Sequence, residues 1–202
     1  MPYACLMKHS DSSTVELHIQ YYIDGAIDVD MLRSFLIFVR ERIPDECETL
    51  DLFINSAGGS VPIALAMAEL LMALPCEVRT CNLSNVDSAS IIVFAAGKER
   101  FAPPGTTFFF HPVGKEVSGI KSATELRQLA DEIDHDTLRE TEFLSLRTGT
   151  DAKKWRDMMD SGILVDDSTA LKLGLATSSE RLTICPSALV VNRMSQSDSV
   201  NL

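Results

Sequence analysis

The sequence has no apolar run near the roughly 20 residues that a membrane-spanning helix requires, so we expect no membrane partner. Its five cysteines are odd in number and lack Cys-x-x-Cys spacing, which argues against a disulfide framework and a zinc site. Positive charge is scarce: 18 Lys and Arg stand against 29 Asp and Glu, for a net charge of −11. Because so acidic a surface repels phosphate backbones, we expect no nucleic-acid partner.

Two further motifs are missing. The glycine fingerprint of dinucleotide-binding proteins does not occur, and the stretch Ser56-Ala57-Gly58-Gly59-Ser60 lacks the lysine of a P-loop. We therefore expect neither a cofactor nor a metal. The first residues hold no apolar run, so we expect no secretory signal and a cytoplasmic protein.

What is present is an alternation of strand and helix patterns. Strands are expected at 14–22, 50–55, 77–83, 100–102, 106–110, 163–165 and 175–177, and helices at 29–42, 61–73, 88–96, 122–147, 151–159 and 168–173. A polar turn is expected at 84–87, and the strands at 100–102 and 106–110 should form a hairpin around Pro103-Pro104-Gly105. The pattern predicts one α/β domain at 14–184, after a short N-terminal segment, 1–13, and before a flexible tail, 185–202.

Ser88 is a candidate nucleophile. Acyl transfer needs a nucleophile, a base within reach, and hydrogen-bond donors where the oxyanion forms. Ser88 stands between a polar turn and an apolar helix, where free N–H groups suit an oxyanion. The same position also suits a helix N-cap, and Ser84 and Ser90 fit that role equally well on local grounds.

His111 and a glycine pair are the other candidates. His111 ends a strand with three phenylalanines, so its polar ring must find a partner or the surface. The remaining histidines lie in weaker contexts: a terminus, a strand and a charged helix face. Gly58 and Gly59 allow a sharp turn that leaves N–H groups facing an incoming chain. Taken singly, each feature is more often explained by a structural role.

Taken together, these motifs resemble a known family. The stretch 54–61, Ile-Asn-Ser-Ala-Gly-Gly-Ser-Val, is similar to Ile-Asn-Ser-Pro-Gly-Gly-Ser-Val of the Clp protease proteolytic subunits. Ser88 precedes an Ala-Ala-Gly ending as that family's nucleophile does, and His111 falls at the family's catalytic histidine. Arg100-Phe101-Ala102-Pro103 and the stretch 170–175 also match family segments, so the resemblance spans about 14–178.

The resemblance implies a crotonase-like, ClpP-like fold of repeated ββα units, with 122–147 as a projecting handle helix. It implies a serine endopeptidase that cleaves unfolded polypeptides or short peptides through an acyl-enzyme, with Ser88 as nucleophile and His111 as base. Gly58 or Gly59, with Ala89, would form the oxyanion hole. The family's partners would be polypeptide substrates, copies of the chain in homo-oligomeric rings (heptamer or tetradecamer), and an AAA+ ATPase unfoldase.

Three departures limit this transfer. The family's catalytic aspartate aligns with Gly162, so the third member is open: Asp160 is preferred, and Asp166 or Asp167 are alternatives. Ala57 replaces the family's proline beside the glycines. Few residues precede the first strand, so the loops that engage an ATPase are expected to be reduced.

Other interpretations remain open. A crotonase-type acyl-CoA enzyme would share the fold but would use carboxylates and give Ser88 no role. A Ser–Lys peptidase would need a base such as Lys98, although the register of His111 argues against it. A non-catalytic subunit of a mixed ring is kept open by the missing aspartate.

Overall fold

The computed structural model describes residues 5–7, 16–184 and 189–191. Within these ranges the strands form one sheet in the order β1-β2-β3-β4-β6-β7, with β5 also beside β4 and β8 beside β2. The strands are β1 (Cys5–Met7), β2 (Glu16–Asp24), β3 (Thr49–Ser56), β4 (Glu77–Asp87), β5 (Glu99–Phe101), β6 (Thr107–Phe109), β7 (Leu164–Asp166) and β8 (Leu189–Val191). The helices are α1 (Val29–Arg42), α2 (Val61–Met72), α3 (Ser90–Ala95), α4 (Ala123–Thr148), α5 (Ala152–Ser161) and α6 (Asp167–Lys172).

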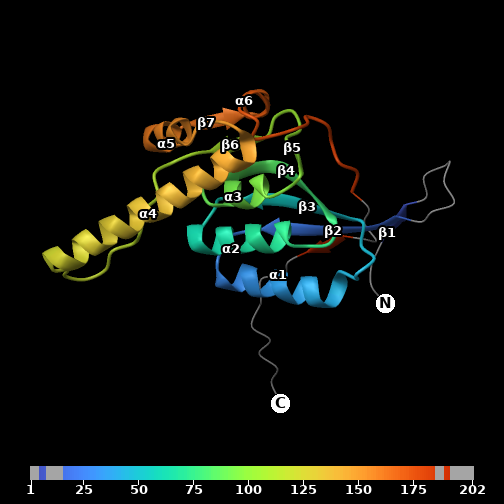
Figure 1. Cartoon of the computed structure of the whole chain (residues 1–202), viewed down its shortest axis with the longest axis horizontal. Helices are drawn as coiled ribbons and strands as arrows, with labels where there is room; N and C mark the ends of the chain where they lie inside the picture. Colours follow the sequence, from blue (N-terminus) through green and yellow to red (C-terminus); the bar gives the residue numbers. More distant parts are fainter. Residues whose placement is uncertain (1–4, 8–15, 185–188, 192–202) are drawn as a thin grey trace, which may run out of the picture.

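The centre of the sheet is parallel, and its two faces bury different residues. β2, β3, β4 and β6 run parallel, whereas β1 and β7 are antiparallel to their neighbours. Side chains of a strand alternate between faces. Leu50 and Leu52 of β3 therefore enter the main core together with Phe35 of α1, on the side where α1 and α2 lie in Figure 1. Phe53 packs with Cys81 in a smaller cluster.

α4 is the long helix that the sequence predicts. The hydroxyl of Ser122 accepts a hydrogen bond from the N–H of Glu125, and the carboxylate of Glu125 accepts one from the N–H of Ser122. Gly149, in the left-handed conformation with φ of 76°, ends the helix. Figure 1 shows the N-terminal half of α4 reaching out from the body, and its buried residues begin only at Asp136. The prediction of a projecting helix is confirmed.

Two predictions about the middle of the chain are wrong. Residues 84–87 are not a turn, because β4 continues to Asp87, where it pairs with Phe109 of β6. β5 and β6 do not form a hairpin either. Both run parallel to β4, with β5 beside its first half and β6 beside its second half. The Pro-Pro-Gly segment therefore shifts the chain along β4 rather than reversing it.

The ends of the domain also differ from the prediction. Residues 175–177 form no strand; only Ser178 bridges to Phe101. β1 lies within the predicted N-terminal segment, and β8 lies within the predicted tail, where it pairs with β2. The remaining parts of both segments fall outside the described residues. In the ranges that are described, no helix has the length and apolar character needed to cross a bilayer.

Candidate active site

The ends of β4 and β6 bring Ser88 and His111 to the same edge of the sheet. Asp87 and Phe109 are register partners in these parallel strands. The N–H of Ser88 donates to the carbonyl oxygen of Phe109 at 2.8 Å, and the carboxylate of Asp87 accepts from the N–H of Phe109 at 3.0 Å. Because the strands run in the same direction, residues that follow their carboxyl ends emerge together.

Ser88 occupies a strained turn between β4 and α3. Its φ of 53° makes it the one non-glycine residue with a left-handed backbone in the described part of the chain. α3 begins at Ser90 with Ala89 as its N-cap, so the prediction of a helix starting at Ser88 is wrong. Such a conformation costs about 1–3 kcal/mol for a residue with a side chain and is concentrated at functional sites. The turn holds Ser88 out of both the strand and the helix.

Gly58 packs directly against this turn. A Cβ atom at Gly58 would lie 2.6 Å from the Cβ of Ser88 and 2.7 Å from the carbonyl oxygen of Asp87. Gly58 also has a φ of 96°, so a side chain there would be strained as well as obstructed. Its N–H donates to the hydroxyl of Ser56 at 3.1 Å and is therefore already occupied.

The amides of Gly59 and Ala89 differ from that of Gly58. Gly59 has a φ of 152° and lies against the backbone of Ile27, whose carbonyl oxygen accepts from the N–H of Ser60. Neither the N–H of Gly59 nor that of Ala89 has a hydrogen-bond partner within the ranges described. Two of the three predicted oxyanion donors therefore have no hydrogen-bond acceptor among the described residues.

His111 is held by the backbone. Its Nδ1 lies 2.8 Å from the carbonyl oxygen of Pro112, and its ring centroid lies 5.5 Å from that of Phe109. A carbonyl oxygen can only accept, so the hydrogen of the neutral ring sits on Nδ1 and the lone pair sits on Nε2. The described residues contain no hydrogen bond between Ser88 and His111. The ring is nevertheless in the tautomer that a general base requires.

The three candidate acids all have other partners. Asp160 pairs with Arg156 at 3.2 Å. Asp166 caps α6 by accepting from the N–H of Thr169, and hydrogen bonds from Thr169 lower the pKa of this exposed carboxyl. Asp167 accepts from the N–H of Gly105 at 3.1 Å. No hydrogen bond joins any of them to His111 in the part of the chain that is described.

Gly162 lies where a partner for His111 would be expected. β6 and β7 are antiparallel with Phe109 opposite Leu164, and the N–H of Phe110 donates to the carbonyl oxygen of Ile163. Extending this register by one more step would place His111 opposite Gly162. Gly162 ends α5 in the left-handed conformation with φ of 65°, and a Cβ atom there would meet nothing within 4 Å. The place is open, and no side chain fills it.

The competing serines and Lys98 lie elsewhere. Ser90 is buried, and its hydroxyl donates to the carbonyl oxygens of Asp87 and Ser56. Ser84 lies within β4. Lys98 pairs with Glu77 at the first residue of β4, whereas Ser88 follows the last. A Ser–Lys pair would have to span the length of this strand.

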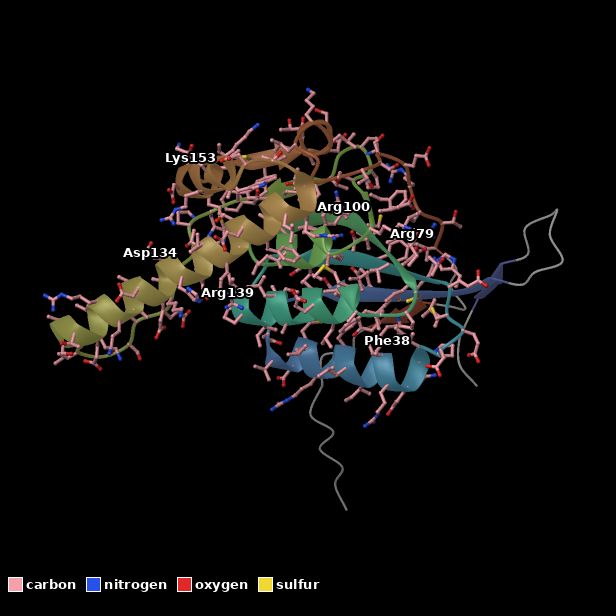
Figure 2. The ribbon with its side chains drawn as sticks, in the orientation of Figure 1. Phe38, Arg79, Arg100, Asp134, Arg139 and Lys153 are labelled. Atoms are coloured by element: carbon pink, nitrogen blue, oxygen red, sulfur yellow. The ribbon has the colours of Figure 1, made fainter. Side chains whose placement is uncertain are left out.

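Buried Arg100 secures the far end of α3, a feature that the sequence motifs did not explain. The guanidinium of Arg100 donates to the carbonyl oxygens of Gly97, Gly174 and Leu175. Its burial lowers the pKa of Arg100 to about 10, so it stays charged at neutral pH. Figure 2 shows this side chain within the body, unlike Asp134 on the projecting part of α4.

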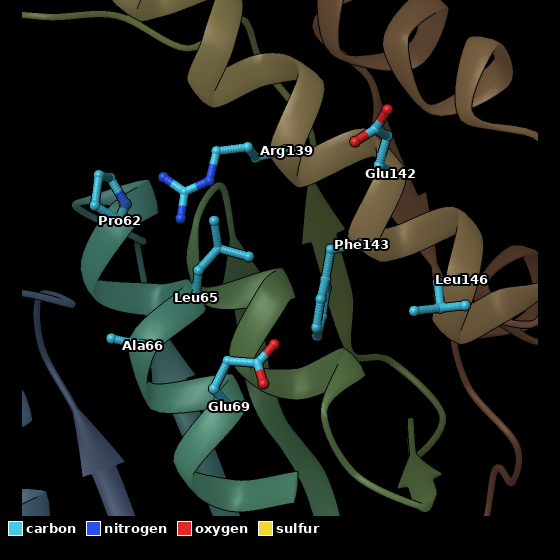
Figure 3. Close-up of a pocket in the computed structure, with 8 residues that line it drawn as sticks. All are labelled: Pro62, Leu65, Ala66, Glu69, Arg139, Glu142, Phe143 and Leu146. Atoms are coloured by element: carbon cyan, nitrogen blue, oxygen red, sulfur yellow. The ribbon is translucent and has the colours of Figure 1, made fainter.

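One pocket of the structure lies apart from Ser88. It encloses about 430 Å³ between α2 and α4. Figure 3 shows its lining: Pro62, Leu65, Ala66, Glu69, Arg139, Glu142, Phe143 and Leu146. None of the candidate catalytic residues belongs to it. The described residues also include no cluster of three His, Cys, Asp or Glu side chains that could hold a metal ion.

Curated relatives carry one recurring name, ATP-dependent Clp protease proteolytic subunit 2. The protein of that name from Thermobifida fusca is 27% identical over 138 residues, which span 59% of this chain and 67% of the relative. The one from Treponema denticola is 31% identical over 61% of this chain and 62% of its own length. The one from Borreliella burgdorferi is 26% identical over 85% of this chain and 87% of its own length.

The fold and the family model agree with these relatives. A mutant of ClpP1 from Listeria monocytogenes superposes with a TM-score of 0.68 at 20% identity, covering 86% of this chain and 92% of that one. This likeness shows the ClpP-type α/β fold. The model of the Clp protease family matches residues 22–178, which is more than half of the chain. The chain therefore belongs to the Clp protease family.

Proposed function

We propose that this protein is a serine endopeptidase that cleaves unfolded polypeptides and short peptides through an acyl-enzyme on Ser88. The observation that carries the proposal is the strained turn at Ser88, with Gly58 packed against it. A helix cap would not need a left-handed backbone. A nucleophile does benefit, because the turn keeps its hydroxyl clear of strand and helix while the amide of the next residue, Ala89, remains free.

The chemistry follows from three groups. Nε2 of His111 takes the hydroxyl proton as Oγ of Ser88 attacks the peptide carbonyl, and the N–H groups of Gly59 and Ala89 hold the oxyanion. His111 then gives the proton to the leaving amine, which breaks the peptide bond and leaves the acyl chain on Ser88. Water, activated by the same ring, releases the acyl chain.

The carbonyl oxygen of Pro112 takes the orienting role of an acid in this scheme. It holds His111 in the required tautomer, and loss of that tautomer costs about 10⁴ in rate in serine proteases. It carries no full charge, so it stabilises the imidazolium less than a carboxylate would. We therefore expect a slower enzyme than a complete triad gives, with Asp160, Asp166 and Asp167 in structural roles.

The assembly and the partners belong to the same proposal. Relatives are named subunits of an ATP-dependent protease, and α4 projects from the body as a contact element would. We propose homo-oligomeric rings in the cytoplasm, fed with unfolded chains by an AAA+ ATPase.

Peptide cleavage by matched variants tests the proposal. Ser88→Ala should keep the fold and the assembly while reducing cleavage of short fluorogenic peptides by about 10³ or more. Ser90→Ala removes a neighbouring hydroxyl that is buried and bonded to the backbone, and it should retain cleavage. Loss of activity in Ser90→Ala but not in Ser88→Ala would contradict the assignment of the nucleophile.

A second candidate is a non-catalytic subunit that completes a mixed ring. The empty place opposite His111, at Gly162, favours it, because no carboxylate supports the base. This candidate predicts a wild-type protein that cleaves no peptide but restores activity to a catalytic subunit from a relative. A crotonase-type acyl-CoA enzyme finds no such support, since it would leave the strained serine without a purpose.

A further inference from the structure

Glu140 is a buried acid without a partner on the inner face of α4. The residue is 1% exposed, and its Oε1 atom has no hydrogen-bond partner in the described part of the protein. Buried polar atoms are nearly always hydrogen-bonded, so an exception points to a missing partner. The mechanism proposed above does not use this carboxyl.

Contacts at the end of α3 fix how far along α4 this residue lies. The guanidinium of Arg147 donates to the carbonyl oxygens of residues 95–97. Glu140 precedes Arg147 by seven residues, two helical turns or about 10 Å. Ser88 precedes Ala95 by the same number of residues. If α3 and α4 run in the same direction, Glu140 is level with Ser88.

A lysine on the other side supports that direction. Lys115 follows His111 by four residues and pairs with Glu132 at 2.7 Å and with Asp136 at 3.6 Å. The chain beyond His111 thus lies beside α4 just before Glu140, and the end of α3 lies beside it just after. Because His111 is at the Ser88 end of α3, we infer that Glu140 is level with the candidate active site.

The neighbours of Glu140 on the helix show which way it points. Arg139 and Phe143 face α2 across the pocket in Figure 3. Thr148 faces α5, where the indole N–H of Trp155 donates to its hydroxyl. At 100° per residue, Glu140 projects between these two sides, in line with Arg147 and toward α3.

The basic side chains around Glu140 are paired with other carboxylates. Burial, and then the charge of Asp136, raises the pKa of Glu140 to about 8. Lys115 and Arg139 both pair with Asp136, and Arg156 of α5 pairs with Asp134 and Asp160. α3 carries no charged residue, and the charge that α2 carries is that of Glu69. None of these cations pairs with Glu140 in the part of the chain that is described, and Arg147 of the same helix donates to the carbonyl oxygens at the end of α3.

We propose that Glu140 determines specificity by receiving the arginine or lysine side chain of the substrate residue whose carbonyl carbon Ser88 attacks. This inference rests on the proposed function, because the side chain reaches Glu140 only when a peptide is seated at Ser88. A guanidinium or ammonium group supplies the N–H donors that Oε1 lacks and favours the ionised carboxylate, giving a charge-assisted pair.

A pair of fluorogenic peptides that differ only in arginine or citrulline at this position tests the inference. Citrulline keeps the shape of arginine without its charge. The wild type should cleave the arginine peptide with kcat/KM about tenfold higher or more, and Glu140→Gln should abolish the difference while still cleaving the citrulline peptide. Glu142→Gln, which changes an exposed acid on the other side of the same helix, should keep the wild-type preference.

The pH dependence separates specificity from a structural effect. In the wild type, the kcat/KM for the arginine peptide divided by that for the citrulline peptide should rise between about pH 6.5 and 9, because Glu140 loses its proton over this range. The same ratio should stay flat in Glu140→Gln. Titration of His111 affects both peptides equally and cancels in the ratio. Equal cleavage of both peptides by the wild type would overturn this inference and leave the proposed function intact. Cleavage of neither peptide would contradict the proposed function and this inference with it.

Discussion

At the scale of single residues, His111 relies on a backbone carbonyl where a side chain is usual in serine proteases. Pro112 accepts from Nδ1, and the residue opposite His111 in the β6–β7 register is Gly162. Gly162 already has the left-handed backbone that asparagine and aspartate tolerate better than other residues. Space for a side chain is present there as well.

Gly162→Asp should therefore raise activity. A carboxylate beside His111 would stabilise the imidazolium that forms as Ser88 loses its proton, so kcat for a short peptide should rise about tenfold or more. Gly162→Asn is the matched control, because it has the same shape and backbone preference without the charge. A Gly162→Asp variant that folds and is no faster than Gly162→Asn would show that the carboxylate cannot reach the ring.

Some of the candidate residues could be predicted from the sequence, and others could not. Ser88, His111 and the glycine pair stand in motifs at fixed spacing, so their meeting at one edge of the sheet was predictable. The third member was not, because the partner of His111 is a carbonyl group and every residue has one. Glu140 was missed for another reason: a charged residue on a charged helix gives no sign of burial until α3 and α5 are packed against it.

At the scale of secondary structure, local signals predicted elements well where they are strong. α1 runs over Val29–Arg42, as its apolar stripe predicts, and α4 begins and ends at the predicted cap residues. The second half of β4 was misjudged because Ser84-Asn85-Val86-Asp87 has turn-like composition. Its strand form depends on pairing with β6, a non-local contact that composition does not encode.

α4 is the element for which we predict a role in assembly. Leu126 is 49% exposed on its projecting half, and water is a poor environment for such a side chain. Replacing Leu126 and Leu129 together by glutamine should halve the mass of the assembly in sedimentation velocity, since ring-to-ring contact would be lost while each ring persists.

A control for this experiment lies on the same helix. Leu146 is 83% exposed but belongs to the base of α4, beside the pocket that faces α2. Leu146→Gln should leave the mass unchanged. If the Leu126 and Leu129 variant also keeps its mass, α4 is not the ring-to-ring contact.

At the scale of the whole molecule, the fold explains why a serine and a histidine 23 residues apart can meet. The chain leaves β4 at Ser88, passes through α3 and β5, and returns along β6 parallel to β4, so both residues emerge at one edge. The alternation of strands and helices predicted an α/β domain. The displaced pairing of β5 and β6 along a single strand was visible only in the structure.

The central claim is that this edge of the sheet makes Ser88 a nucleophile, and covalent labelling tests it most directly. The wild-type protein should be treated with a fluorophosphonate under conditions that favour assembly, and the modified residue identified by peptide mass spectrometry. The account predicts one phosphonylated residue, Ser88, and loss of the modification in His111→Ala. Modification of Ser90 instead, or no modification under any assembly condition, would contradict it.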